Sequence, residues 1–144
     1  RGQGYFVRQP SASDVADLYR LSLAHLLISQ EPHRARRVLE DDADATAGGG
    51  DPVKAVEGLF RRWIIEAGSG ALITSFRLLQ IQLGPVRRLE AGAVEDLQDE
   101  AQRLLAARTP SAERLALVRN FHGRRIRLAD RLAAFLEATG RPGK

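Results

Sequence analysis

Glycine and proline divide the chain after residue 10 into segments of helical length, and this division limits the possible folds more than any other feature. Within these segments, apolar residues recur three and four positions apart, which is typical of a helix with one buried face. No segment after Pro10 has the pattern of a strand. We therefore expect an all-α protein, an antiparallel bundle of six or seven helices.

The positions of glycine and proline predict helices at residues 11–30, 32–47, 52–67, 71–90, 93–108 and 111–139, the last being the longest. Ser11 and Asp14 have the spacing of a capping box at the start of the first helix. Asp51-Pro52 offers an N-cap followed by a proline in the first turn of the third. Gly84-Pro85 falls inside the fourth helix, where we expect a kink or a short break.

The composition is that of a globular domain. A chain of 144 residues can bury about 70% of its unfolded surface and needs no staple. The absence of cysteine excludes disulfides and thiolate metal sites and is compatible with a cytoplasmic location. No apolar run approaches the ~20 residues needed to cross a bilayer, so we expect no membrane insertion.

The formal net charge of +4 would suit a nucleic-acid partner. The densest cationic run lies along the last expected helix and consists of Arg119, Arg124, Arg125, Arg127 and Arg131. Such runs usually form a solvated helix face, and a direct phosphate-binding surface is the alternative.

The first expected helix is apolar over much of its circumference. Its main stripe contains Val15, Leu18, Leu21, His25 and Ile28, and Leu23, Leu26 and Leu27 widen it. A helix of this kind needs cover on two sides. We expect the core to cover one side and a second subunit to cover the other.

Histidines are the main candidates for chemistry near neutral pH, because the sequence has no H-E-x-x-H, P-loop or G-x-S-x-G motif. His122 shares a helical stripe with Val118 and Ile126, which predicts that its ring faces inward. It is either a core histidine bonded to a neighbour or a pocket residue. His25 is expected in packing or in an interface.

Glu57 and Arg61 are four residues apart in the third expected helix and are therefore neighbours on one face. Phe60 and Ile64 lie beside them. The two charged residues form either a surface ion pair or an inward pair that lines a polar pocket.

The first ten residues differ from the rest. Tyr5-Phe6-Val7 is a short β-prone run that follows a glycine-containing turn and ends at Pro10. We expect it to be the last strand of a β-hairpin. A strand of this kind running directly into a helical domain resembles the wing of a GntR-family transcription regulator followed by its effector-binding domain.

The helical part resembles the FadR-like effector domain of that family, often called the FCD domain. Members usually carry an Asp-x-x-Phe-His segment followed by alanine, a glycine turn and leucine. This chain has Glu57-Gly58-Leu59-Phe60-Arg61, then Ala67, Gly68-Ser69-Gly70 and Leu72. Ala106-Ala107-Arg108 and the helix with His122 resemble the last two helices of the family, so the resemblance covers essentially the whole chain.

The departures of this chain from the family's pattern imply that the family's metal site is absent. Many members hold a divalent metal with one aspartate and three histidines. Here Glu57 replaces the aspartate, Arg61 replaces the first histidine, and the region near Glu100 supplies no second histidine. Only His122 matches a ligand position, and a guanidinium cannot ligate a cation. We expect neither a metal nor another cofactor.

We expect instead a pocket between residues 52–67, 71–90 and 111–139 that binds a small organic anion. Arg61 is the expected anchor, because a buried guanidinium near a histidine offers directional donors to a carboxylate or phosphate. The expected ligand-binding residues are Arg61, His122, Glu57, Phe60, Ile64, Glu100 and Arg119.

Residues 11–144 are thus expected to sense the effector and to form a homodimer. Residues 1–10 are expected to be the end of a wing and the linker from an upstream DNA-binding domain, which the effector would control through the Pro10 linker. The chain is not expected to be an enzyme. Two alternatives are a structural dimerisation module without a ligand, and a small helical enzyme with His122 as base and Glu57 or Glu100 as helper.

Overall fold

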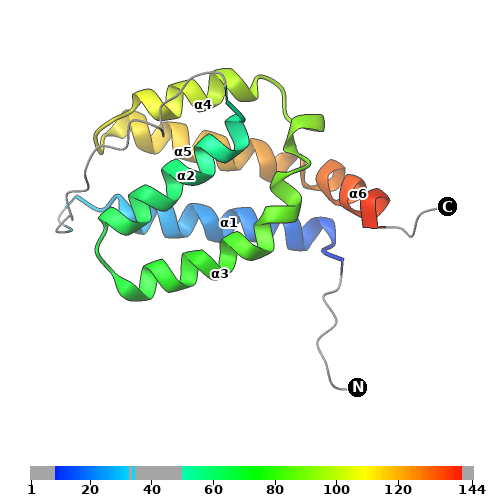
Figure 1. The fold of residues 1–144 in the computed structure, drawn as a ribbon, viewed down its shortest axis with the longest axis horizontal. Coiled ribbons are helices and arrows are strands. Elements are labelled where there is room, and N and C mark those ends of the chain that lie inside the picture. Colours follow the sequence, from blue (N-terminus) through cyan, green and yellow to red (C-terminus); the bar gives the residue numbers. More distant parts are fainter. Residues whose placement is uncertain (1–8, 33, 35–49, 141–144) are drawn as a thin grey trace.

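The computed structural model describes residues 9–32, 34 and 50–140. These residues form α1 (Ala12–Ser29), α2 (Pro52–Glu66), α3 (Gly70–Arg87), the 3-10 turn η2 (Glu90–Gly92), α4 (Leu97–Ala106), α5 (Ala112–Arg127) and α6 (Ala129–Gly140) (Figure 1). Within this part of the chain, the all-α prediction is confirmed. Its six α-helices fit the expected total of six or seven, although two of them fall within the single helix expected at 111–139. The expected strand at residues 5–7 lies outside the described residues. Of the expected helix 32–47, only residues 32 and 34 are described.

Helix α1 packs against α2, α3, α5 and α6, and it lies between α3 and α5 in Figure 1. Val15, Tyr19 and Leu26 are completely buried on it. Its broad apolar surface is therefore covered largely by helices of the same chain. Leu21 and Ile28 are the large apolar side chains of α1 that remain exposed.

The predicted helix starts are confirmed by their caps. The backbone N–H of Asp14 donates to Ser11 Oγ at 3.1 Å, and the backbone N–H of Ser11 donates to Asp14 Oδ2 at 3.0 Å. Asp51 Oδ1 accepts from the backbone N–H of Val53 at 2.9 Å. Each cap satisfies a backbone donor that the first helical turn leaves without a partner.

Helix α3 continues through Gly84 and Pro85 to Arg87. Of the two expected outcomes, a kink or a short break, the break does not occur. Pro85 is exposed, so the carbonyl that its missing N–H leaves unpaired can face water. The continuation matters for the site, because it carries Arg87 into the interior.

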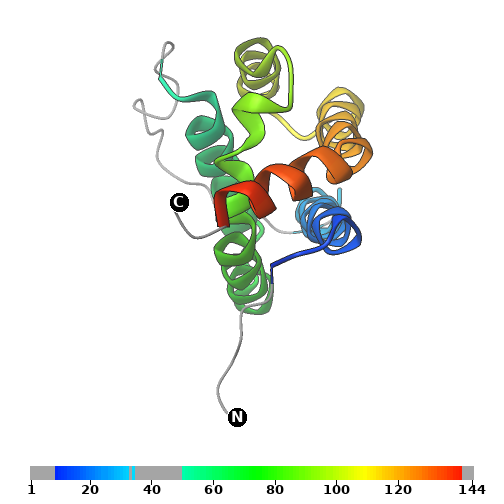
Figure 2. The same ribbon diagram turned by 90° about the vertical axis from the view of Figure 1, so that its right-hand side faces the viewer.

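The last predicted helix is wrong in extent, because α5 ends at Arg127 and α6 begins at Ala129. Figures 1 and 2 show α6 turning away from the direction of α5. The turn lets Leu132 and Leu136 reach the core. The last turn of α5 contains arginines and the first turn of α6 contains Asp130. Positive charge at a helix C-terminus and negative charge at an N-terminus are both favourable.

The fifth predicted helix begins too early. Residues 90–92 form η2, and α4 starts only at Leu97, after Asp96 in the left-handed region at φ 59°. Ala93 and Val94 are buried in this connection. Burial of these two residues explains why an apolar pattern continues where no α-helix does.

Candidate functional site

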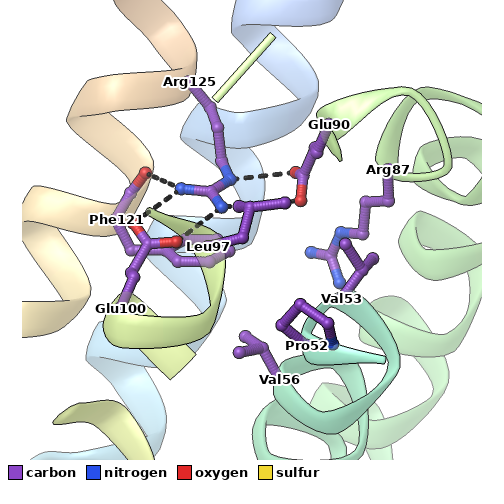
Figure 3. A pocket seen from close by; sticks show the side chains of 9 residues that line it. All are labelled: Pro52, Val53, Val56, Arg87, Glu90, Leu97, Glu100, Phe121 and Arg125. Atoms are coloured by element: carbon purple, nitrogen blue, oxygen red, sulfur yellow. Dashed lines mark hydrogen bonds and ion pairs between the residues drawn. The ribbon is translucent and has the colours of Figure 1, made fainter. Parts of the chain in front are cut away.

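A cluster of buried polar side chains joins four of the helices and η2. We call Tyr19 of α1, Arg87 of α3, Glu90 of η2, Glu100 of α4 and Arg125 of α5 the buried ion cluster (Figure 3 draws its four charged members). Tyr19, Arg87, Glu90 and Arg125 are at most 1% exposed, and the Glu100 side chain is 12% exposed. Buried charges are retained in proteins when they are paired or serve a function.

Arg125 is the best-satisfied member of the cluster. It donates from Nε to Glu90 Oε2 at 2.9 Å, and from Nη1 and Nη2 to the two oxygens of Glu100 at 2.9 and 2.7 Å. Nη1 also donates to the Phe121 carbonyl at 3.0 Å, and the guanidinium stacks 3.5 Å from the centre of the Phe121 ring. Burial alone would lower the pKa of Arg125, but the bonds and charges of Glu100 and Glu90 raise it.

Glu90 links this arginine to α1. The hydroxyl of Tyr19 donates to Glu90 Oε2, the oxygen that also accepts from Arg125. Burial, together with the charge of Glu90, raises the pKa of Tyr19 well above 10. Tyr19 therefore remains a neutral donor at physiological pH.

Arg87, unlike Arg125, makes no hydrogen bond with its guanidinium group among the described residues. All three of its guanidinium nitrogens are buried, and the residue is 1% exposed. Its ion-pair contact is with Glu57, whose Oε2 lies 3.7 Å from Nη1. Burial lowers the pKa of Arg87, although Glu90 and other neighbours act against this. A guanidinium keeps its proton even so, which leaves a buried cation whose N–H groups are free to bind an acceptor.

This guanidinium borders a small cavity between α2, α3, α4 and α5 (Figure 3). The cavity is lined by Pro52, Val53, Val56, Arg87, Glu90, Leu97, Glu100, Phe121 and Arg125. It offers about 10 Å³ to the centre of a water-sized sphere, which is about the space of one water molecule. An apolar wall from α2 thus faces a charged wall that contains Arg87 and Arg125 together with Glu90 and Glu100.

His122 is a core histidine. A carbonyl only accepts, so Nδ1–H donates to Val118 O at 2.8 Å, and Nε2 then accepts from Ser22 Oγ at 2.9 Å. The ring stacks on Phe60 with 5.6 Å between ring centres. Burial lowers the pKa of His122 to about 3, so the ring is neutral at physiological pH. The sequence left open whether His122 is a core histidine or a pocket residue, and the structure agrees with the core histidine.

The structure separates the predicted site residues into three groups. Phe60 and Ile64 are buried in the core, with Phe60 against His122. Glu100 is in the buried ion cluster, and Glu57 lies at its edge against Arg87. Arg61 and Arg119 are exposed.

The expected burial of Arg61 beside His122 is therefore wrong. The inward face of α2 carries Val56, Phe60 and Ile64, and Arg61 follows Phe60 by one residue, about 100° around the helix. Arg61 lies instead at a surface groove between α2 and α3.

Sequence reasoning missed Arg87, although a signal for it exists. The buried stripe of α3 runs through Phe76, Leu79 and Leu83, and Arg87 is the next position four residues on. A charged residue that continues an apolar stripe is a candidate for a buried cation. Tyr19 and Glu90 carry no comparable signal, because their contact spans 71 residues of sequence.

Within residues 9–32, 34 and 50–140, no three His, Cys, Asp or Glu side chains gather closely enough to share a metal ion. None of the helices in the described part of the chain is both long and apolar enough to cross a membrane. Comparison of the chain with known protein families, curated proteins and solved structures finds no match.

Proposed function

We propose that this chain is the effector-sensing and dimerisation domain of a GntR-type transcription regulator, built as an antiparallel bundle of the FadR-like kind. A small organic anion is its effector, and Arg87 holds that anion. The domain is not an enzyme. It acts in the cytoplasm on DNA through an upstream winged-helix domain, and the helix order and sequence pattern described above support this assignment.

The observation that carries the proposal is the unsatisfied guanidinium of Arg87. Its N–H groups are desolvated and make no hydrogen bond among the described residues, and its charge is compensated only through space, by Glu90 and by Glu57 at 3.7 Å. An unpaired buried polar group costs about 1–3 kcal/mol, and more when it is charged. A carboxylate in the cavity would accept two parallel hydrogen bonds from this planar group. The ligand would thereby replace interactions that the protein itself does not supply.

The small size of the cavity indicates how sensing works. Space for about one water does not hold an organic anion, so binding requires the wall to move. Leu97 begins α4, a helix of ten residues that packs against α2 and α5 and follows Asp96 at positive φ. We assign the movement to α4. An anion that binds only when α4 is displaced favours that conformation.

The buried ion cluster provides a route from the ligand to the linker. Glu90 is three residues from Arg87 and is bonded to Tyr19 of α1. Helix α1 begins two residues after Pro10. A ligand that changes the charge beside Glu90 therefore acts on the helix that the proposed linker enters.

One alternative has its own support. His122 is satisfied by protein groups on both nitrogens, and the cavity is nearly filled. These observations favour a structural dimerisation module without a ligand. The two functions differ in one measurable respect, which is whether an anion binds.

Calorimetric titration decides between them. The wild type is titrated with formate, acetate, pyruvate, benzoate and inorganic phosphate, and so are Arg87→Met and Arg61→Ala. The proposal expects at least one carboxylate to bind the wild type and Arg61→Ala equally, and to bind Arg87→Met at least tenfold more weakly. If the domain is a structural dimerisation module, none of the three proteins should bind any of the anions. Equal binding to wild type and Arg87→Met would place the anion elsewhere and overturn the assignment of Arg87.

A further inference from the structure

The outer face of α3 carries an apolar ridge. Leu78 is 61% exposed and Ile81 is 68% exposed, the highest values among the large apolar side chains that stay exposed in the described residues. The inner face of α3 packs against α1, α2 and α6. Single exposed leucines are ordinary on protein surfaces, but this pair lies beside two grooves.

The first groove lies between α2 and α3. It is lined by Arg61, Ile64, Ile65, Ile73, Phe76, Arg77, Gln80 and Ile81 and offers about 250 Å³ to water-sized spheres. Its charged residues are both arginines. Gln80 Oε1 is buried there without a hydrogen-bond partner among the described residues.

The second groove lies on the other side of the ridge, between α3, α1 and α6. It offers about 680 Å³, and its lining includes Leu18, Leu21, Pro85 and Leu136. Its charged residues are Asp14 and Asp17, both acidic and both exposed. Asp17 also pairs with the exposed Arg20 at 2.8 Å, but a surface pair of this kind is worth little.

Ile81 lines both grooves and therefore lies between them. Consider a two-fold axis that passes through this position, lies in the contact surface and is perpendicular to the line joining the grooves. It places the first groove of one copy opposite the second groove of the other. It sets the basic rim of each copy against the acidic rim of the other, so that the charge match occurs twice. The ridges of two such copies then meet at the axis, where Ile81 of one copy lies against Ile81 of the other, as in a self-complementary interface.

We propose that a second copy of this chain covers the α3 face, with Ile81 at the two-fold axis. This inference rests on the dimerisation that the proposed function includes, and it specifies the surface that forms the dimer. The acidic rim comes from α1, near Gln9 and Pro10. The dimer contact thus touches the end of the domain where the linker enters, which is where a pair of DNA readers would be positioned.

Sedimentation velocity of the whole chain from 1 to 100 μM tests the proposal. We expect a dimer for the wild type and for Ile28→Asp, which changes an exposed apolar residue of α1 outside both grooves. Ile81→Asp should raise the dimer dissociation constant at least a hundredfold while leaving the thermal melting of the monomer cooperative. A monomeric wild type, or equal effects of Ile28→Asp and Ile81→Asp, would overturn the proposal.

A charge exchange tests the orientation of the two copies. Arg77→Glu and Asp17→Arg should each raise the dissociation constant about tenfold, and the double variant should return it to within about threefold of wild type. No recovery in the double variant contradicts the pairing of the two rims. Titration of monomeric Ile81→Asp with the carboxylate that binds wild type separates this inference from the proposed function. Arg87 is buried on the inner side of α3, whereas Ile81 is exposed on its outer face, so the anion should still bind to the monomer.

Discussion

Arg125 and Glu100 are joined by two parallel hydrogen bonds, Nη1 to Oε2 at 2.9 Å and Nη2 to Oε1 at 2.7 Å, inside the helical bundle. Arg87 borders the same cavity and has no hydrogen bond to any described residue. The two buried arginines therefore serve different purposes. Arg125 holds α4, α5 and η2 together, whereas Arg87 keeps its donors available.

This difference predicts opposite effects of the same substitution on stability. Arg125→Met removes the cation that Glu90 and Glu100 require, and breaking a buried pair from one side costs about 3–5 kcal/mol. Arg87→Met removes a charge that makes no hydrogen bond and replaces it with an apolar chain. We expect its free energy of unfolding to equal or exceed that of wild type. Urea denaturation of the two variants measures this, and a loss above 3 kcal/mol for Arg87→Met would contradict the account of a poorly paired cation.

The neutral state of His122 predicts a loss of stability in mild acid. Its pKa is about 3 in the folded chain because of burial, whereas an unfolded histidine has a pKa near 6.5. Below about pH 6.5 the unfolded state takes up a proton that the folded state does not, so stability falls with decreasing pH by up to about 1.4 kcal/mol per unit. Denaturation between pH 6.5 and 5 should show this slope in wild type and a flatter one in His122→Asn. Identical slopes would mean that His122 titrates normally when folded.

Ser22 should contribute to stability through the same histidine. Ser22→Ala leaves the buried Nε2 of His122 without its donor, which costs about 1–3 kcal/mol. The matched control is Ser75→Ala, since Ser75 also bonds a histidine, His25, but is exposed. That control should change stability by no more than about 0.5 kcal/mol. Equal losses in the two variants, measured by urea denaturation at pH 7.5, would show that burial of the Ser22 bond has no special value.

We expect the stability of the folded chain to fall at alkaline pH because of Tyr19. Burial raises the pKa of its hydroxyl well above 10, whereas an unfolded tyrosine ionises near 10. Above that pH the unfolded state loses a proton that the folded state keeps, so stability falls as pH rises. Tyr19→Phe should cost about 1.5–3 kcal/mol at pH 7 through the lost bond to Glu90, and it should reduce the decline above pH 10. Thermal melting at pH 7 and pH 10.5 compares the two proteins.

Helix type and most helix starts could be predicted because they depend on local chemistry. Ser11 and Asp51 cap helices through bonds to residues two or three positions away, and that spacing is visible in the sequence. The division between α5 and α6 could not be predicted from glycine or proline, because neither occurs at Leu128. It follows from the packing of Leu132 and Leu136 against the core.

The candidate site could be predicted only in part. The inward direction of His122 and the burial of Phe60 follow from helical periodicity. The placement of Arg61 failed because periodicity leaves a residue at the edge of an apolar face undecided. The contact between Tyr19 and Glu90 and the isolation of Arg87 depend on how distant helices meet, which no local pattern contains.

A crystal structure of the protein grown with the carboxylate that binds in the titration would show directly whether Arg87 holds the anion. We expect electron density for the anion at the cavity between α2 and α4, with its oxygens about 2.7–2.9 Å from guanidinium nitrogens of Arg87 and with α4 displaced from its present position. An anion bound elsewhere, with Arg87 contacting only water or Glu57, would contradict this expectation.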